Sequence, residues 1–267
     1  MDLISPLQTI QPRTILVTGC SRGIGAEIVA GLLRDGHQVV ATARRRESMN
    51  PLIKLAEQLE ATDRLLTLQM DVCQQESVDD VGDRVDDLWG GVDVIINNAG
   101  VADSAPLHRT DDALWSSMIE INLTGSFRVT RRFLSKMRKR DYGRVIFISS
   151  IAGLTGCLYT SAYCAAKHGV IGMMRALALE VAPTAVTANA ICPGFVETDM
   201  ARNAMNQIEA STQRDASEAR ASLEAFTPQK RLFQVDEILH VTRFLISEGA
   251  RGINGQAITV DGGQVMH

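Results

Sequence analysis

The chain has 267 residues, of which 45% are hydrophobic and 22% charged, close to the composition of ordinary globular domains. Its formal net charge of −4 excludes the basic field that draws nucleic acid or acidic membrane surfaces. No apolar run approaches the roughly 20 residues of a membrane-spanning helix, and Met1–Arg13 lacks the pattern of a secretory signal. We therefore expect a soluble, cytoplasmic protein with no nucleic-acid or membrane partner, and its five dispersed cysteines indicate neither disulfides nor a metal site.

Short apolar runs alternate with amphipathic segments along the chain. Seven runs are predicted to be strands: Ile15–Thr18, Val39–Ala43, Leu65–Met70, Val92–Ile96, Val145–Ser149, Val186–Ile191 and Ala257–Val260. Helices are predicted at Ile24–Arg34, Pro51–Leu59, Ser77–Trp89, Asp112–Lys139, Ala162–Ala182 and Asp236–Ile246. This alternation favours a Rossmann-like α/β fold, a doubly wound parallel seven-stranded sheet with helices on both faces. We expect a single domain over 1–267, with 1–13 as an N-terminal extension.

A glycine-rich turn, Thr18–Gly25, follows the first predicted strand and opens the first helix. Glycines allow a tight turn and bring backbone N–H groups close to a pyrophosphate, whose charge a helix N-terminus favours. The spacing is G-x-x-x-G-x-G, and the alternative is a tight turn without a ligand. The position between strand and helix favours a dinucleotide site. The expected contacts are Gly19, Ser21, Arg22, Gly23, Ile24 and Gly25.

The end of the second strand indicates which dinucleotide binds. NAD sites usually place an acid there for the ribose 2′-hydroxyl, whereas NADP sites use arginine for the 2′-phosphate. Here Ala43 leaves room, and Arg44 with Arg22 can clamp a phosphate, although Arg44–Arg46 could also be a solvated loop. The sequence therefore predicts NADP(H). Two further contacts are expected after the third strand, Asp71 to the adenine amino group and Val72 beside it.

Charged residues gather on two of the predicted helices. Acids lie between Asp79 and Asp87, and basic residues lie between Arg128 and Arg140. Since such runs are usually solvated helix faces, we expect exposed charge here and no metal site.

Tyr163 and Lys167 lie four residues apart in a predicted helix, on one helix face. A free phenol has a pKa of roughly 10, too high for efficient acid–base catalysis near neutrality, and a cation one turn away is expected to lower it. Ser150 follows the fifth strand, which precedes this helix, so strand and helix must lie side by side. These three side chains form a candidate acid–base site.

Together, these motifs resemble the short-chain dehydrogenase/reductase family in its compact, single-domain branch. The resemblance runs from Thr14 to Gly263 and includes, in the family order, Thr18–Gly25, Asn97-Asn98-Ala99-Gly100, Asn122, Ser150, Tyr163-x-x-x-Lys167, Pro193-Gly194 and Thr198. It implies an oxidoreductase that moves a hydride between a nicotinamide cofactor and a carbonyl or alcohol carbon. It also implies a homotetramer (or homodimer).

The resemblance assigns roles to the candidate residues. Tyr163 gives its proton to the carbonyl oxygen, and Lys167 lowers the Tyr163 pKa and binds the nicotinamide ribose. Ser150 donates a hydrogen bond to the substrate oxygen, and Asn122 holds a water that connects Lys167 to solvent. Further cofactor contacts are implied at Asn98, Ala99, Gly100, Pro193, Gly194, Val196 and Thr198, although Asn98 could instead brace the strand end.

The segment from Glu197 to Pro228 lacks a strand and is rich in Ala, Met, Glu, Gln and Ser. A helical insertion after a strand's carboxyl end is a natural lid, so we expect residues 195–230 to cover the substrate crevice. A surface hairpin without function is the alternative. The candidate pocket residues are mostly apolar and favour a hydrophobic ketone, acyl thioester or ring: Leu154, Cys157, Leu158, Tyr159, Phe195 and Met200.

The leading hypothesis is an NADPH-dependent reductase of small-molecule ketones or 3-oxoacyl compounds, with Tyr163 as general acid. An NAD-dependent secondary-alcohol dehydrogenase working oxidatively is disfavoured by Ala43 and Arg44. A non-catalytic NADP-binding sensor is disfavoured because all four catalytic candidates are present. Leu179 stands where carrier-linked reductases often have an arginine, and this difference disfavours the hypothesis of a carrier-bound substrate.

Overall fold

The seven predicted strands form one sheet in a computed structural model that describes residues 11–212 and 215–266. The strand order is β3-β2-β1-β4-β5-β6-β7, and every pair of neighbours is parallel. The predicted Rossmann-type sheet is thus confirmed, and most of the predicted extension 1–13 lies outside the described residues. The strands are β1 (Thr14–Thr18), β2 (Gln38–Ala43), β3 (Leu65–Gln69), β4 (Val94–Asn97), β5 (Gly143–Ile148), β6 (Val186–Pro193) and β7 (Ala257–Val260).

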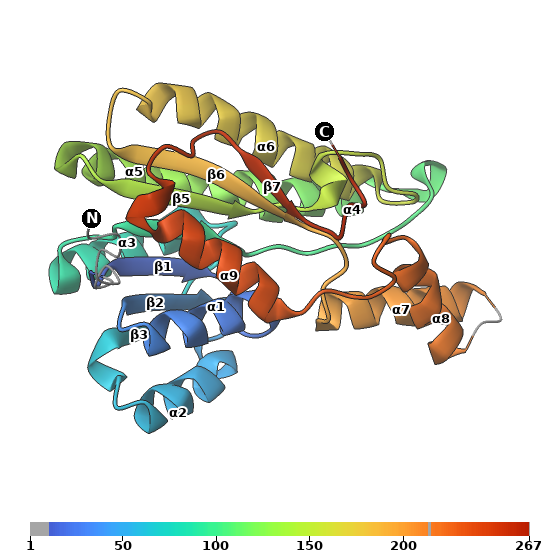
Figure 1. Cartoon of the computed structure of the whole chain (residues 1–267), viewed down its shortest axis with the longest axis horizontal. Helices are drawn as coiled ribbons and strands as arrows, with labels where there is room; N and C mark the ends of the chain where they lie inside the picture. Colours follow the sequence, from blue (N-terminus) through green and yellow to red (C-terminus); the bar gives the residue numbers. More distant parts are fainter. Residues whose placement is uncertain (1–10, 213–214, 267) are drawn as a thin grey trace, which may run out of the picture.

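Helices cover both faces of the sheet (Figure 1). They are α1 (Gly23–Arg34), α2 (Asn50–Gln58), α3 (Gln75–Trp89), α4 (Asp112–Ile119), α5 (Gly125–Arg140), α6 (Ser161–Val181), α7 (Asp199–Ser211), α8 (Ala216–Ala225) and α9 (Val235–Ile246). Side chains of β1 alternate between two apolar cores: Ile15 and Val17 pack with α1, α2 and α9, and Leu16 packs with α3, α5 and α6. Among the described helices, none is long and apolar enough to cross a membrane.

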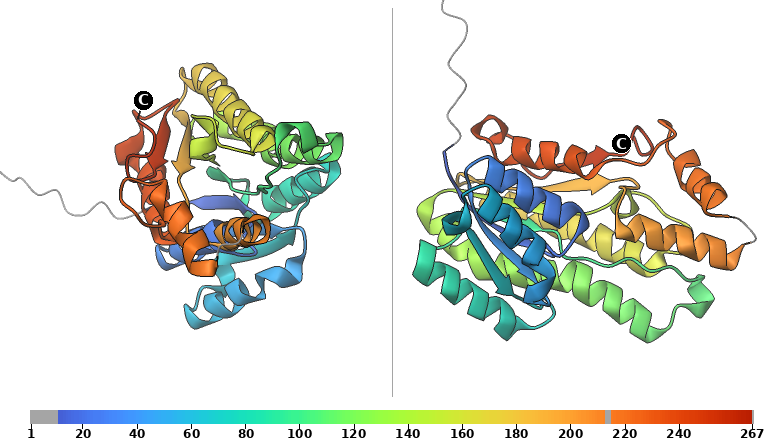
Figure 2. Two further views of the ribbon diagram at one scale, coloured as in Figure 1. Left: turned by 90° about the vertical axis from the view of Figure 1, so that its right-hand side faces the viewer. Right: turned by 90° about the horizontal axis from the view of Figure 1, so that it is seen from below.

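The chain order of the strands reverses at β1, whose neighbours are β2 and β4. The connections that leave β1 and β4 therefore run to opposite faces of the sheet. In open α/β sheets, such a reversal marks the crevice at the carboxyl ends of the strands in which ligands bind. Helices α7 and α8 lie outside the sheet and project beyond those carboxyl ends (Figures 1 and 2). The helical insertion expected after β6 is thus present.

The prediction of one uninterrupted helix at Asp112–Lys139 is wrong in one detail. A π-helical turn, Glu120–Thr124, separates α4 from α5. The side chain of Asn122 explains it: Nδ2 donates to Met118 O at 2.9 Å and to Val101 O at 3.0 Å, so the amide competes with the regular helical bonds. Such turns are frequent at functional sites.

The charged faces of α3 and α5 meet each other. The expectation of exposed charge is confirmed for most of these residues, such as Asp83 and Lys136, and is wrong for Arg132 and Asp86, which lie in the contact. Arg132 lies 2.6 Å from Asp83, 3.0 Å from Asp86 and 3.6 Å from Asp79, and its side chain is only 16% exposed. Lys136 adds a contact to Asp86 at 2.8 Å. The two runs carry opposite charge because they pair across the α3–α5 contact, a relation that the spacing within either helix does not show.

Candidate active site

The candidate site lies where four strands end. The glycine turn follows β1, Asn98–Gly100 follows β4, Ser150 follows β5, and Pro193 is the last residue of β6. Because these strands are adjacent and parallel, their carboxyl ends meet at one edge of the sheet. The fold therefore brings together motifs that are up to 175 residues apart, from Thr18 to Pro193 (193 − 18).

The turn after β1 leaves no room for extra side chains. Gly19 has a φ of 71°, and a methyl group on it would lie 2.8 Å from Ala99 Cα. One on Gly25 would lie 2.5 Å from Gly19 O. Arg22, the N-cap residue of α1, makes no side-chain cap bond, so the first N–H groups of α1 face the turn without that partner. This cradle fits the pyrophosphate of a dinucleotide.

Asn98 and Ala99 hold β4 against this turn. Thr18 Oγ1 accepts hydrogen bonds from Asn98 N at 3.0 Å and Ala99 N at 2.8 Å. Asn98 Nδ2 donates to Thr18 O at 2.8 Å and Gly19 O at 3.0 Å. The bracing alternative for Asn98 thus has direct support, and a contact of its side chain with a cofactor stays a prediction.

The residues expected near the adenine half of the cofactor differ in what their side chains do. Arg44 is exposed just after β2, beside the buried Ala43. Asp71 Oδ1 accepts from Cys73 N at 3.0 Å and so closes a turn, and the Val72 side chain packs in the core. The predicted contact of Val72 with a cofactor could therefore be made only by the backbone of Val72.

Arg22, the second half of the expected phosphate clamp, points to α7. Its Nε lies 3.4 Å from Asp199 Oδ2, and its side chain is 71% exposed. Such an exposed ion pair is worth little, so Arg22 can move toward a phosphate at small cost. Asp199 is thus a site neighbour that the sequence did not suggest.

Asn122, Lys167 and Gly100 meet behind the predicted catalytic tyrosine. A methyl group on Gly100 would lie 2.7 Å from Asn122 Oδ1 and 3.7 Å from Lys167 Nζ. Asn122 is buried, and its Oδ1 accepts from Val101 N at 3.2 Å. The π-turn thus directs an amide from the α4–α5 segment to within reach of a lysine on α6.

Lys167 and Tyr163 share one face of α6, as the spacing predicts. Lys167 Nζ donates to Ile148 O at 2.9 Å and lies 5.6 Å from the Tyr163 ring centroid. Burial lowers the pKa of Lys167 to about 8. Burial also raises the pKa of Tyr163 to about 12, although a hydrogen bond with Ser150 opposes the rise. The expected lowering of the Tyr163 pKa by Lys167 is therefore not found: desolvation of the phenolate raises the pKa, and the opposing influence comes from Ser150.

Ser150 is fixed beside this pair. It caps the short turn after β5, where its Oγ accepts from Ala152 N at 3.1 Å. The same side chain lies close enough to the Tyr163 phenol to oppose the rise in the Tyr163 pKa. Ser150, Tyr163 and Lys167 therefore face one another, and an oxygen that enters the site can meet the serine and the phenol together.

The segment after β6 closes the other side of the crevice. Gly194 N donates to Val260 O at 3.0 Å, and Val196 is buried. Thr198 Oγ1 donates to Val196 O at 3.2 Å, and a methyl group on Gly23 would lie 3.3 Å from Thr198 Cγ2. Thr198, which follows the carboxyl end of β6, thus lies close to the glycine turn.

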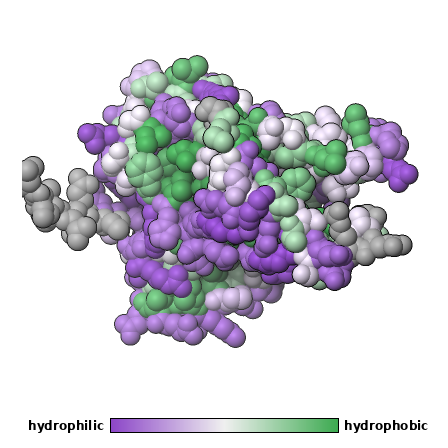
Figure 3. All heavy atoms as spheres, turned by 45° about the vertical axis from the view of Figure 1, so that its right-hand side comes forward, coloured by the Kyte–Doolittle hydropathy of each residue, from purple (hydrophilic) through white to green (hydrophobic). Residues whose placement is uncertain are grey.

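The expected pocket residues are unevenly exposed. Leu154 packs against the core, and Phe195 lies beside Phe226 with ring centroids 6.2 Å apart. Leu158 is 77% exposed, Tyr159 56% and Met200 43%, so these three form open surface, and Cys157 is half-buried. On the face seen in Figure 3, hydrophobic side chains gather mainly in the upper half and hydrophilic ones form a broad central band.

The α7–α8 hairpin contacts both sides of the crevice. Besides the Arg22–Asp199 pair, Gln207 Nε2 donates to Asp103 Oδ1 at 3.0 Å, and Ser104 Oγ donates to Gln207 Oε1 at 2.9 Å. At its base, Arg220 of α8 pairs with Glu197. The sequence did not single out these residues, because contacts over 23 to 104 residues leave no local pattern.

Comparisons with known proteins agree with this geometry. Residues 13–209 match the family model described as short chain dehydrogenase. The chain is 36% identical to the 3-oxoacyl-acyl-carrier-protein reductase MabA of Mycobacterium avium, over 95% of this chain and 90% of that one. It is also 36% identical to the 3-oxoacyl-acyl-carrier-protein reductase FabG of Escherichia coli (strain K12), over 94% and 96%. A crystal structure of a variant actinorhodin polyketide ketoreductase with NADPH superposes with a TM-score of 0.90 at 34% identity, covering 95% of this chain and 97% of that one.

Proposed function

Since this chain belongs to the short-chain dehydrogenase family, we propose that it reduces the carbonyl group of a hydrophobic ketone or 3-oxoacyl compound with NADPH. One observation carries the proposal: Ser150, Tyr163 and Lys167 face one another at the strand edge that also bears the glycine cradle. Nucleotide binding alone does not require a phenol, a hydroxyl and an ammonium at this point. The residues that surround the cradle supply the chemistry of a carbonyl reductase.

The proposed cofactor contacts follow from the cradle. The backbone N–H groups of the glycine turn and the start of α1 hold the pyrophosphate, and Arg44 with Arg22 binds the 2′-phosphate. Lys167 binds the nicotinamide ribose, and the segment from Pro193 to Thr198 flanks the nicotinamide. When bound, the dinucleotide supplies the hydride that adds to the carbonyl carbon.

The protein groups bind and protonate the substrate oxygen. Ser150 donates a hydrogen bond that orients the carbonyl and stabilises the negative charge that develops on its oxygen. Tyr163 gives its phenol proton to that oxygen. The phenol of Tyr163 is protonated at neutral pH, as a proton donor must be, but a pKa raised to about 12 makes it a weak acid. The proposal therefore requires that the phenolate be stabilised as the proton leaves. The charged Lys167 then stabilises the phenolate of Tyr163. Asn122 orders the water through which Tyr163 regains its proton.

The substrate class follows from apolar surface at the site and from the relatives. Leu158, Tyr159, Met200 and Phe226 are all more than 40% exposed, so a hydrophobic substrate gains by covering them. The relatives named above are 3-oxoacyl and polyketide ketoreductases. These two facts support a ketone or 3-oxoacyl thioester, and the α7–α8 hairpin is the proposed lid over it.

The proposal is tested with a panel of ketones and 3-oxoacyl thioesters, followed by the loss of NADPH absorbance. The Tyr163→Phe variant keeps the ring and removes the proton, so kcat should fall about a thousand-fold on the best compound. NADPH affinity, measured by fluorescence titration, should change less than about two-fold, since Phe keeps the packing. Turnover above a few per cent of the wild-type value would refute Tyr163 as the acid.

A further inference from the structure

Two chain segments run side by side at the base of the α7–α8 hairpin. Phe233 N donates to Phe195 O at 2.8 Å, and Glu197 N donates to Phe233 O at 2.8 Å. Val196 and Phe233 form a parallel bridge, and both are buried, at 6% and 1% exposure. The backbone of Glu197 is therefore held in a fixed stem, independently of its side chain.

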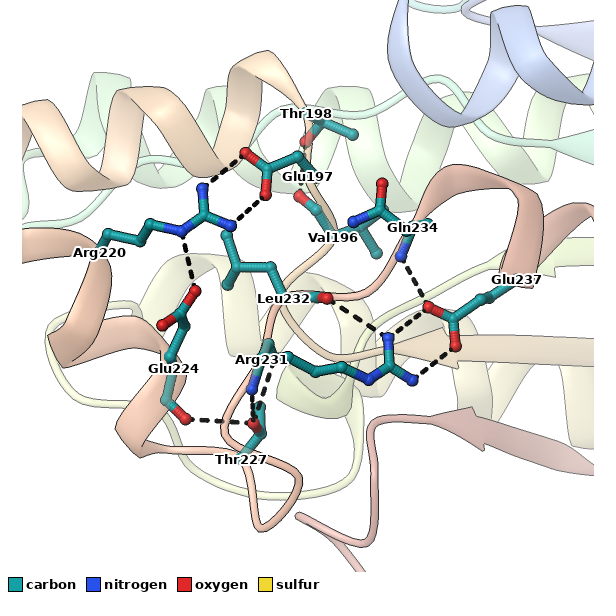
Figure 4. A network of polar contacts seen from close by, with 10 residues as sticks. All are labelled: Val196, Glu197, Thr198, Arg220, Glu224, Thr227, Arg231, Leu232, Gln234 and Glu237. Carbon is teal, nitrogen blue, oxygen red and sulfur yellow. Dashed lines mark hydrogen bonds and ion pairs between the residues drawn. The ribbon is translucent and has the colours of Figure 1, made fainter. Parts of the chain in front are cut away.

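The Glu197 side chain connects this stem to α8 (Figure 4). Both of its oxygens accept from Arg220, at 3.0 Å from Nη1 and 2.7 Å from Nη2. Arg220 Nε donates to Glu224 at 2.8 Å, which fixes the guanidinium from its other side. A bidentate arginine–carboxylate pair restricts direction as well as distance. The hydrogen bond from Arg220 also keeps the pKa of Glu197 below its usual value, so the pair stays charged at neutral pH.

Another bidentate pair holds the returning segment to the body of the protein. Arg231 donates to both oxygens of Glu237 in α9, at 2.6 and 2.8 Å (Figure 4). The stem is thus anchored on the body side by Arg231–Glu237. The hairpin is anchored to the stem by Glu197–Arg220. Because the stem is fixed, the Glu197–Arg220 pair restricts how the hairpin is directed.

The position of Glu197 in the chain connects the Glu197–Arg220 pair to the crevice. It lies between Val196 and Thr198, and Thr198 is both the N-cap of α7 and the neighbour of Gly23 across the crevice. Arg22–Asp199, at 3.4 Å, is a single contact, and Gln207 of α7 is hydrogen-bonded to Asp103 and Ser104 on the other side. A change in the direction of α8 is thus passed to α7 and to the mouth of the site.

We propose that Glu197 and Arg220 are positioning residues that direct the α7–α8 hairpin over the substrate site. The inference rests on the proposed function of the crevice. The pair is partly exposed, with side chains 28% and 44% accessible, so its effect on global stability is small. Its effect on the hairpin is the measurable one.

The test compares E197Q and R220Q with E224Q, a control that removes the other partner of Arg220 and leaves the stem intact. In E197Q and R220Q, the KM for the best ketone should rise about three- to five-fold while kcat changes less than about two-fold. Amide hydrogen exchange in residues 199–212 and 215–225 should accelerate by the same factor. The double variant should be no worse than either single one, because both remove the same contact. R220K should rescue part of the effect, since it keeps the charge and loses the fork.

Several results would overturn the inference. One is that E197Q and E224Q change KM and hydrogen exchange equally. Another is a double variant whose fold-change in KM is the product of the two single fold-changes. A third is faster hydrogen exchange in the hairpin with an unchanged KM. If the wild-type protein reduces no compound of the panel, the proposed function fails. The exchange comparison between E197Q and E224Q still decides whether the pair directs the hairpin.

Discussion

At the scale of single residues, the structure shows which polar side chains of the candidate site are already engaged in hydrogen bonds within the protein. The amide of Asn98 is used to brace β1, and one oxygen of Asp71 closes a turn. Lys167 is buried with a carbonyl oxygen as its partner, which leaves its charge easier to lose than that of an exposed lysine. The charge state of the site is thus a property of its burial.

This burial predicts a pH dependence. The pKa of Lys167 is lowered to about 8, so the ammonium loses its proton as the pH rises through that value. The phenolate formed in reduction then lacks its counter-charge, and kcat/KM for reduction should fall about ten-fold per pH unit above pH 8, as expected for loss of one proton. In K167R the cation persists, so the decline should disappear even if the plateau is lower. An unchanged decline in K167R would assign the titration to another group.

The choice of cofactor is a second residue-scale prediction. Arg44→Ala removes the exposed guanidinium at the end of β2 and should weaken NADPH binding at least about ten-fold, since a charged hydrogen bond to phosphate is lost. NADH binding, which lacks the phosphate, should be unaffected. Arg45→Ala, one residue further along the exposed loop, is the matched control. Equal losses of NADPH and NADH affinity would contradict the clamp.

At the scale of elements, two local irregularities shape the site. The π-turn carries Asn122 toward Lys167, and the glycine turn brings the backbone of β1 against that of β4. The π-turn depends on the Asn122 side chain, whose amide competes with the helical hydrogen bonds, whereas the glycine turn depends on close approach of backbone atoms. A side chain at the glycine positions would push β1 and β4 apart.

A substitution in the glycine turn tests this close approach. Gly25→Ala places a methyl group 2.5 Å from Gly19 O and from Asn98 Nδ2, so the turn must open. We expect a loss of about 1–3 kcal/mol in the free energy of unfolding, with NADPH binding weakened to match. Gly172→Ala, in a helix with no neighbouring atom within 4 Å of the new methyl group, should keep NADPH affinity and gain slightly in stability. Thermal melting and NADPH titration of both variants check this, and equal behaviour would exclude the steric explanation.

At the scale of the whole molecule, the two apolar cores hold a rigid sheet, and the polar contacts of the hairpin lie outside them. This division places strand-end residues on the rigid part and the proposed lid on the part held by ion pairs and hydrogen bonds. The outer side of α5 and α6 is less completely packed. It has a hollow of about 640 Å³ that is lined in part by the exposed Phe127 and the partly buried Leu134 and Met173.

The homotetramer (or homodimer) expected from the family remains a prediction, and this hollow offers a test. Phe127→Glu places a charge on the 42% exposed ring and should shift the protein to a smaller species in sedimentation velocity. Leu88→Glu, on the exposed side of α3, should not. A wild-type protein that sediments as a monomer at micromolar concentration would contradict the expectation.

The sequence by itself determined the sheet, the strands' approximate bounds and the candidate motifs. These features are local: a strand or helix shows in the period of its apolar residues, and Tyr163 and Lys167 share a face through helical spacing alone. Motifs such as the glycine turn are equally local because their chemistry depends on backbone shape. The family resemblance then supplied residues such as Asn122 that no spacing indicated.

Only the tertiary structure decided how the side chains are engaged. The raised pKa of Tyr163, the pairing of α3 acids with α5 bases, the π-turn and the Glu197–Arg220 pair all depend on neighbours distant in sequence. Burial and ion pairing are set by whatever folding brings within a few ångströms, and a residue's own segment does not contain that information.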